Sequence, residues 1–152
     1  MLFRSYGEII DTDENCPTLT FNTIGRHQSM IVRTKVCTNN SPWLQNVNVG
    51  DIVNVPISHG EGRFVAPEEL IKKLAENGQI ATQYVDLDGT PTANVHFNPN
   101  NSYCAIEGIT SPDGRVLGKM GHSERIGCGL YQNVPGNYDL GLFASAVKYF
   151  NI

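Results

Sequence analysis

The stretch from Ala105 to Arg125, A-I-E-G-I-T-S-P-D-G-R-V-L-G-K-M-G-H-S-E-R, carries the clearest structural pattern in this chain. At its centre, Ser111 to Gly114 form a strong turn sequence, because Pro presets φ and Gly accepts positive φ. Apolar and β-branched residues on both sides predict two strands, Tyr103 to Ile109 and Arg115 to Met120. We therefore expect a strand-turn-strand unit that delivers the chain into Gly-His-Ser-Glu at residues 121–124.

His122 and Glu124 stand two positions apart at the end of this unit. In extended backbone, side chains at such spacing project to the same side. A carboxylate that accepts a hydrogen bond from one ring nitrogen fixes the tautomer and makes the other nitrogen a stronger base. The pattern predicts a general base with an orienting acid. The alternative is a turn histidine with Glu124 paired to Arg125 or to solvent, because His-x-Glu is a common sequence.

Outward from this unit, the pattern predicts short strands and two helices. Four further strands are expected, at Thr18 to Ile24, Met30 to Cys37, Asp51 to Ile57 and Ile80 to Val85. One helix is expected to begin at Pro67-Glu68-Glu69 and to end before Gly78, with Leu70, Ile71 and Leu74 on one side. A closing helix is expected after Asp139, with apolar residues at helical spacing at Leu140, Phe143, Ala144 and Val147. The pattern alone indicates either an α+β fold or an α/β domain with antiparallel excursions.

Composition and charge exclude several classes of protein. The 152 residues are 40% hydrophobic, which suits one globular core, and the net charge is -4. No basic cluster is dense enough to follow a phosphate backbone, so we expect no nucleic-acid partner. No apolar run approaches the roughly 20 residues that span a bilayer, and the start lacks a secretory signal. We expect a cytoplasmic protein with no membrane partner.

The cysteines and histidines give no metal-binding pattern. Cys16, Cys37, Cys104 and Cys128 form no Cys-x-x-Cys pair, and the four histidines are dispersed. We expect four free thiols, most of them in or near the core, and no metal site.

Two further motifs lie upstream, Pro56 to Phe64 (P-I-S-H-G-E-G-R-F) and Ser41 to Trp43 (S-P-W). Together with Ala105 to Arg125, they resemble the class I glutamine amidotransferase domain, with its Cys-His-Glu triad, of phosphoribosylformylglycinamidine synthase. The resemblance runs from about Tyr6 to the C-terminus. It implies an α/β fold of the flavodoxin-like, class I glutamine amidotransferase kind, of which residues 6–152 are the C-terminal half with antiparallel excursions. Residues 1–5 are an off-pattern start.

By this resemblance, His122 and Glu124 take the catalytic His and Glu roles of the triad. In the family, a Cys thiolate attacks the side-chain amide of glutamine, and the ammonia released passes to a synthase domain or subunit of the same enzyme. That partner uses ATP and Mg²⁺ to convert formylglycinamide ribonucleotide into formylglycinamidine ribonucleotide in purine biosynthesis. The resemblance therefore implies glutamine and the synthase part as partners, and no cofactor in this domain.

The family's nucleophile is missing from its expected context. It stands on a Gly-x-Cys-x-Gly turn, and none of the four cysteines here has such neighbours. In the family this turn lies shortly before the segment that matches Tyr6, so the resemblance implies a truncated sequence or a false start. We expect this chain to be inactive alone. The alternative is a non-catalytic interaction or regulatory module that keeps part of the fold.

The loop after the strand at residues 51–57 holds further candidate site residues. His59, Gly60 and Glu61 are expected to touch glutamine or to shape the rim of the cleft, with Gly60 and Gly62 permitting unusual backbone dihedrals. The alternative is a set of hydrogen bonds that only rigidifies the loop.

Overall fold

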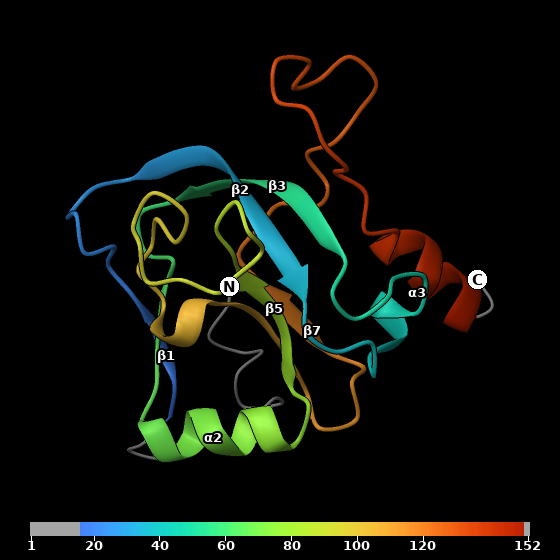
Figure 1. Ribbon diagram of the computed structural model, residues 1–152. Helices are drawn as coiled ribbons and strands as arrows, with labels where there is room; N and C mark the ends of the chain where they lie inside the picture. The colour runs from blue at the N-terminus through green and yellow to red at the C-terminus, as the bar shows by residue number, and fades with distance from the viewer. Residues whose placement is uncertain (1–15, 151–152) are drawn as a thin grey trace.

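A computed structural model describes residues 16–150 of the chain (Figure 1). The predicted boundary between residues 5 and 6 lies outside this range. The described strands are β1 (Thr18–Thr20), β2 (Gln28–Val36), β3 (Ile52–His59), β4 (Arg63–Val65), β5 (Ile80–Tyr84), β6 (Ile106–Thr110) and β7 (Leu117–Lys119). Two helices, α2 (Glu68–Glu76) and α3 (Leu142–Phe150), and two 3₁₀ turns, η1 (Pro42–Leu44) and η2 (Tyr103–Ala105), complete the described elements.

Five of the strands form one sheet in the order β3-β2-β5-β6-β7, and β1 pairs with β4 in a small second sheet. Every pairing between these strands is antiparallel. The predicted mixed α/β class with antiparallel excursions is therefore confirmed. The predicted hairpin is also present, because β6 and β7 pair in the register Thr110 with Leu117 and Gly108 with Lys119.

Helix α2 forms as its sequence predicts. Pro67 precedes its first turn, which holds two acidic residues, and Gly78 follows its end with a φ of 65°. Leu74 is buried, and Leu70 and Ile71 pack partly buried beside it on a core cluster under the sheet. Figure 1 shows α2 lying beside β1, away from α3.

Helix α3 does not bury those of its apolar residues whose helical spacing predicted it. It packs on η1 and buries Leu142 and Ala146, whereas Phe143 and Val147 are 60% and 50% exposed. Apolar residues lie all round this helix, so their spacing does not determine which side is buried. The small side chain of Ala146 favours the observed face because it lets the helix approach closely.

Several predicted strands are shorter than expected, among them β7, which was expected from Arg115 to Met120. The strand expected from Thr18 to Ile24 ends at Thr20, because a turn follows in which the Gly25 N–H donates to the Asn22 carbonyl. The strand expected from Tyr103 begins at Ile106, because η2 precedes it with positive φ at Cys104 and Ala105. Strand β4 was not expected, because its three residues are too few to show a period.

The cysteine prediction holds only in part. Cys37, Cys104 and Cys128 are free thiols, but Cys104 and Cys128 are exposed rather than in or near the core. Cys104 lies in η2, and Cys128 lies in a turn. Neither helix in residues 16–150 has the length and apolar character needed to cross a membrane.

Candidate active site

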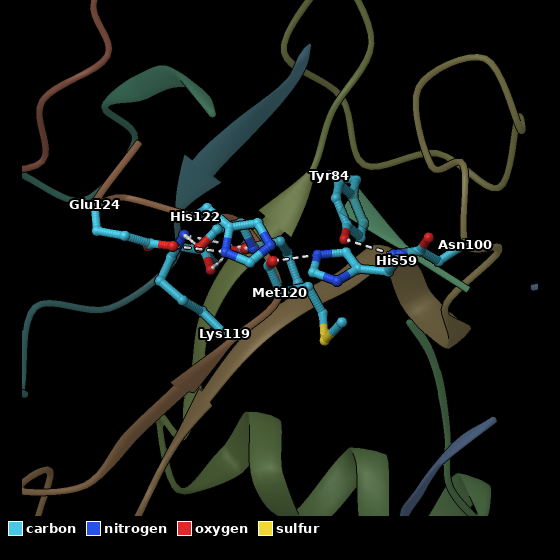
Figure 2. A network of polar contacts seen from close by, with 10 residues as sticks. His59, Tyr84, Asn100, Lys119, Met120, His122 and Glu124 are labelled. Atoms are coloured by element: carbon cyan, nitrogen blue, oxygen red, sulfur yellow. Dashed lines mark hydrogen bonds and ion pairs between the residues drawn. The ribbon is translucent and has the colours of Figure 1, made fainter. Parts of the chain in front are cut away.

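The segment after β7 and strand β3, at the opposite edge of the sheet order, place the candidate base. The chain leaves β7 through Gly121, and the backbone N–H of His122 donates to the Pro56 carbonyl of β3 over 2.9 Å. The His122 ring then lies 2.8 Å from Glu124, measured from Nδ1 to Oε1 (Figure 2). Because a carboxylate only accepts hydrogen bonds, Nδ1 carries the proton. Nε2 of His122 is buried and has no hydrogen-bond partner among residues 16–150.

The carboxylate of Glu124 is in its charged form at neutral pH. Partial desolvation acts to raise the pKa of Glu124, but hydrogen bonds from its own backbone N–H and from His122 outweigh that effect and lower the pKa. Arg125 lies 3.7 Å away, from Nε to Oε1. Glu124 therefore contacts both His122 and Arg125. The backbone of residues 122–125 is a turn, in which the Arg125 N–H donates to the His122 carbonyl over 3.1 Å, so the expected extended backbone is wrong while the expected pair of side chains is present.

His59 is the one upstream candidate that the fold brings to His122. The two imidazole rings stack with centroids 4.9 Å apart and planes 20° from parallel. Nε2 of His59 is hydrogen-bonded to the backbone carbonyl of Met120, just before the His122 segment (Figure 2). Two motifs that are far apart in the sequence are thus joined by a ring contact.

Gly60 and Glu61 lie away from this contact. Glu61 is exposed, and neither Gly60 nor Gly62 has positive φ, so neither adopts the left-handed conformation that glycine permits. The loop conformation is instead held by Asn22. Its side-chain amide donates to the His59 carbonyl over 2.7 Å and accepts from the Gly62 N–H. The loop therefore has the rigidifying hydrogen bonds of the alternative interpretation.

Burial lowers the pKa of His59 below its ordinary value of 6.5, with a smaller contribution from His122, despite opposing effects of the Met120 carbonyl and Glu107. The unfolded chain therefore takes up this proton at a higher pH, and the folded state loses stability as pH falls below about 6.5. We expect urea unfolding to show this loss between about pH 7.5 and 5.5, and to show less of it in His59→Asn. An equal pH dependence in both proteins would contradict this assignment.

A pocket of about 370 Å³ adjoins these two histidines. Apolar side chains from distant segments line one part of it, including Trp43, Leu142 and Phe143. Trp43 also packs against the core, and its indole N–H donates to the Arg115 carbonyl over 2.7 Å. A partly apolar pocket with convergent polar groups is typical of a site for a small molecule.

The structure adds a charged residue that the sequence interpretation missed. Glu107 is fully buried in β6 and pairs with the ammonium of Lys119 over 3.1 Å. Burial acts to raise the pKa of Glu107, but Lys119, the Thr82 hydroxyl and the Gly121 N–H have the larger combined effect. They lower the pKa of Glu107 below its ordinary value, so the carboxylate is charged. The sequence could have indicated this ion pair, because Glu107 and Lys119 stand in the two strands of a predicted hairpin, where opposite charges often pair. The predicted absence of a metal site stays a prediction, and residues 16–150 hold no group of three candidate ligands.

Comparison with known proteins gives consistent matches. The family model for the CobB/CobQ-like glutamine amidotransferase domain matches residues 3–150. The chain is 34% identical to phosphoribosylformylglycinamidine synthase subunit PurQ of Methanococcus maripaludis over an alignment 163 residues long. This alignment covers 93% of this chain and 57% of that protein. It is 42% identical to the subunit of the same name from Thermomicrobium roseum over 85 residues, covering 56% of this chain and 35% of the relative.

A solved structure described as PurLQS from Thermotoga maritima is similar in fold. Its TM-score is 0.64 at 24% sequence identity, over 88% of this chain and 52% of that one. The chain thus spans about half the length, or less, of these relatives. The family match over nearly all of the chain, the names of the relatives and the shared fold confirm the resemblance given by the sequence motifs. The chain belongs to the CobB/CobQ-like glutamine amidotransferase domain family.

Proposed function

We propose that this chain supplies the general base and the orienting acid of a cysteine-dependent glutamine amidotransferase. The hydrogen bond between Nδ1 of His122 and Glu124 is the observation that carries the proposal. It leaves Nε2 as the nitrogen that exchanges protons, and the Glu124 carboxylate stabilises the imidazolium formed when Nε2 is protonated.

In the proposed reaction, a Cys thiolate attacks the side-chain amide carbon of glutamine. The C–N bond then breaks, and protonated Nε2 of His122 gives its proton to the departing ammonia, leaving a glutamyl thioester. Water next attacks the thioester while Nε2 accepts a proton from it. The products are glutamate and the regenerated thiolate, which pairs with protonated His122.

We further propose that the ammonia serves a phosphoribosylformylglycinamidine synthase, as the names of the relatives suggest. The synthase domain or subunit would bind ATP and Mg²⁺ and use the ammonia to convert formylglycinamide ribonucleotide into formylglycinamidine ribonucleotide. In this arrangement the amidotransferase domain itself needs no cofactor.

We also propose that the chain does not hydrolyse glutamine alone. Its four cysteines lie at positions 16, 37, 104 and 128, and none of them lines the pocket beside His122. The nucleophile would have to come from a Gly-x-Cys-x-Gly turn in another segment.

A chimera tests this function directly. A segment that carries the family's Gly-x-Cys-x-Gly turn would be joined ahead of this chain, and glutamate release from glutamine would be measured. We expect activity in the chimera and none in the 152-residue chain. His122→Ala should lower the rate by about 10²–10⁴-fold, the usual range for a general base. Glu124→Gln should lower it too, because the amide cannot stabilise the imidazolium.

The matched control is His96→Ala, since His96 is exposed and does not line the pocket. We expect this variant to keep the activity of the parent chimera. Glutamate release by the 152-residue chain that His122→Ala abolishes would contradict the proposed need for an outside nucleophile. A folded chimera without activity would favour a non-catalytic module instead.

A further inference from the structure

The buried carboxylate of Glu107 contacts three groups, two of which belong to the segment that leads to the candidate base. Its Oε1 lies 3.1 Å from Nζ of Lys119 and accepts a hydrogen bond from the backbone N–H of Gly121. Its other oxygen accepts a hydrogen bond from the Thr82 hydroxyl of β5. The side chain of Glu107 is fully buried and that of Lys119 is 9% exposed, so water does not screen this ion pair.

The same ion pair holds Gly121 from both sides. Glu107 accepts from its N–H, while Nζ of Lys119 donates to its carbonyl over 3.2 Å. The peptide groups before and after Gly121 are therefore both fixed, and the second of them is the one that joins Gly121 to His122. With the bond from the His122 N–H to the Pro56 carbonyl, the backbone at the base is held at three successive points.

The space around Gly121 is shaped for this contact. A Cβ atom at this position would lie 2.5 and 2.7 Å from the two methyl groups of Val55 and 2.9 Å from Oε1 of Glu107. The carboxylate can reach the Gly121 N–H only because no side chain stands there. Gly108 gives similar room, since a Cβ there would lie 2.7 Å from the Thr82 hydroxyl oxygen.

We infer that the buried Glu107–Lys119 ion pair is a positioning device that sets the placement of His122 through the two peptide groups of Gly121. The inference rests on the proposed function, because placement matters to the chemistry only if His122 transfers protons. Glu107 and Lys119 act here as positioning residues. A reaction slows greatly when its catalytic base is displaced by about 1 Å. A rigid backbone next to His122 would therefore keep the proton-transfer rate high.

A purely structural ion pair would serve the fold without affecting the base, and the experiment must separate these roles. The test variant is Glu107→Gln/Lys119→Met, which removes both charges while Gln can still accept from Gly121. Neutral replacement of a whole buried pair is tolerated far better than removal of one partner. The matched control is Asp113→Asn/Arg115→Met, which removes the exposed pair on the same hairpin, 3.9 Å from Nε to Oδ2.

The first measurement uses the uniformly ¹⁵N-labelled 152-residue chain. In the parent chain and the control, NMR should show one His122 tautomer and a downfield Nδ1–H signal from the bond to Glu124. In the test variant we expect this signal to be lost and the Gly121 amide proton to exchange about tenfold faster, since a neutral acceptor holds it less strongly. Thr82→Val, a milder change, should weaken the same signals if the test variant does not fold.

The second measurement uses the chimera. The test variant should lower kcat for glutamine hydrolysis by about 10–100-fold with little change in KM, the effect typical of an outer support of an active group. Combined with His122→Ala, it should cause no further loss, because both changes act on the same group. A structural role predicts additive losses and a kcat that follows the folded fraction.

The two proposals can fail separately. An unchanged His122 signal in the folded test variant, or an unchanged kcat, would overturn the positioning role and leave the proposed base intact. Loss of the His122 signal together with a chimera whose activity does not depend on His122 would instead overturn the proposed function, while the ion pair would still be shown to set the ring.

Discussion

Glu107→Ala is expected to lower the free energy of unfolding by about 3–5 kcal/mol, the range for removing one partner of a buried ion pair. The change leaves the Lys119 ammonium buried without its counter-charge. It also leaves the Thr82 hydroxyl and the Gly121 N–H without their acceptor. Urea unfolding followed by circular dichroism measures the loss. An exposed acid gives the comparison, and Glu76→Ala at the end of α2 should have a much smaller effect.

The same carboxylate sets a pH dependence. The folded state lowers the pKa of Glu107 below its ordinary value of 4.5, so its contribution to stability is fully present above about pH 4.5. As pH falls further, through the lowered folded-state pKa, the carboxylate takes up a proton and that contribution is lost. The Glu107→Gln/Lys119→Met variant should lack this part of the acid sensitivity. Identical acid unfolding of the two proteins would contradict the assignment.

Leu74→Ala is expected to cost about 2–5 kcal/mol, the usual loss for a buried leucine. Leu74 is the fully buried side chain of α2, and it packs on a cluster that includes Phe64 and Ile109. The truncated side chain leaves a cavity at the point where the helix meets the sheet. We expect the midpoint of urea unfolding to fall accordingly.

Leu70→Ala on the same helix is the matched control, because Leu70 is only partly buried against the same cluster. It should cost clearly less than Leu74→Ala, since less apolar surface leaves the core. Equal losses for the two variants would show that helix propensity, rather than core packing, holds α2 in place.

The parts of the site that depend on neighbours in sequence could be predicted. The Ser-Pro-Asp-Gly turn specifies its own geometry, so the hairpin of β6 and β7 follows from local chemistry. The contact between His122 and Glu124 was predicted, but not its backbone, because residues 122–125 form a turn rather than the extended segment expected there. Helix α2 follows from its Pro, its acidic first turn and the glycine after it.

The parts that depend on tertiary packing could not be predicted. The stack of His59 on His122 requires the end of β3 to approach the segment after β7, which no local pattern specifies. The buried face of α3 depends on its fit against η1, and its many apolar residues leave the choice open. The 3₁₀ turn at η2 has positive φ at Cys104 and Ala105, where propensity favours a strand.

The register of the β6–β7 hairpin has a consequence for how this family can vary. Gly108 pairs with Lys119 in this register, which places Lys119 beside the strand that carries Glu107. One inserted or deleted residue in the turn would rotate every later side chain of β7 to the opposite face of the sheet. The length of the turn therefore determines on which face of the sheet Lys119 lies.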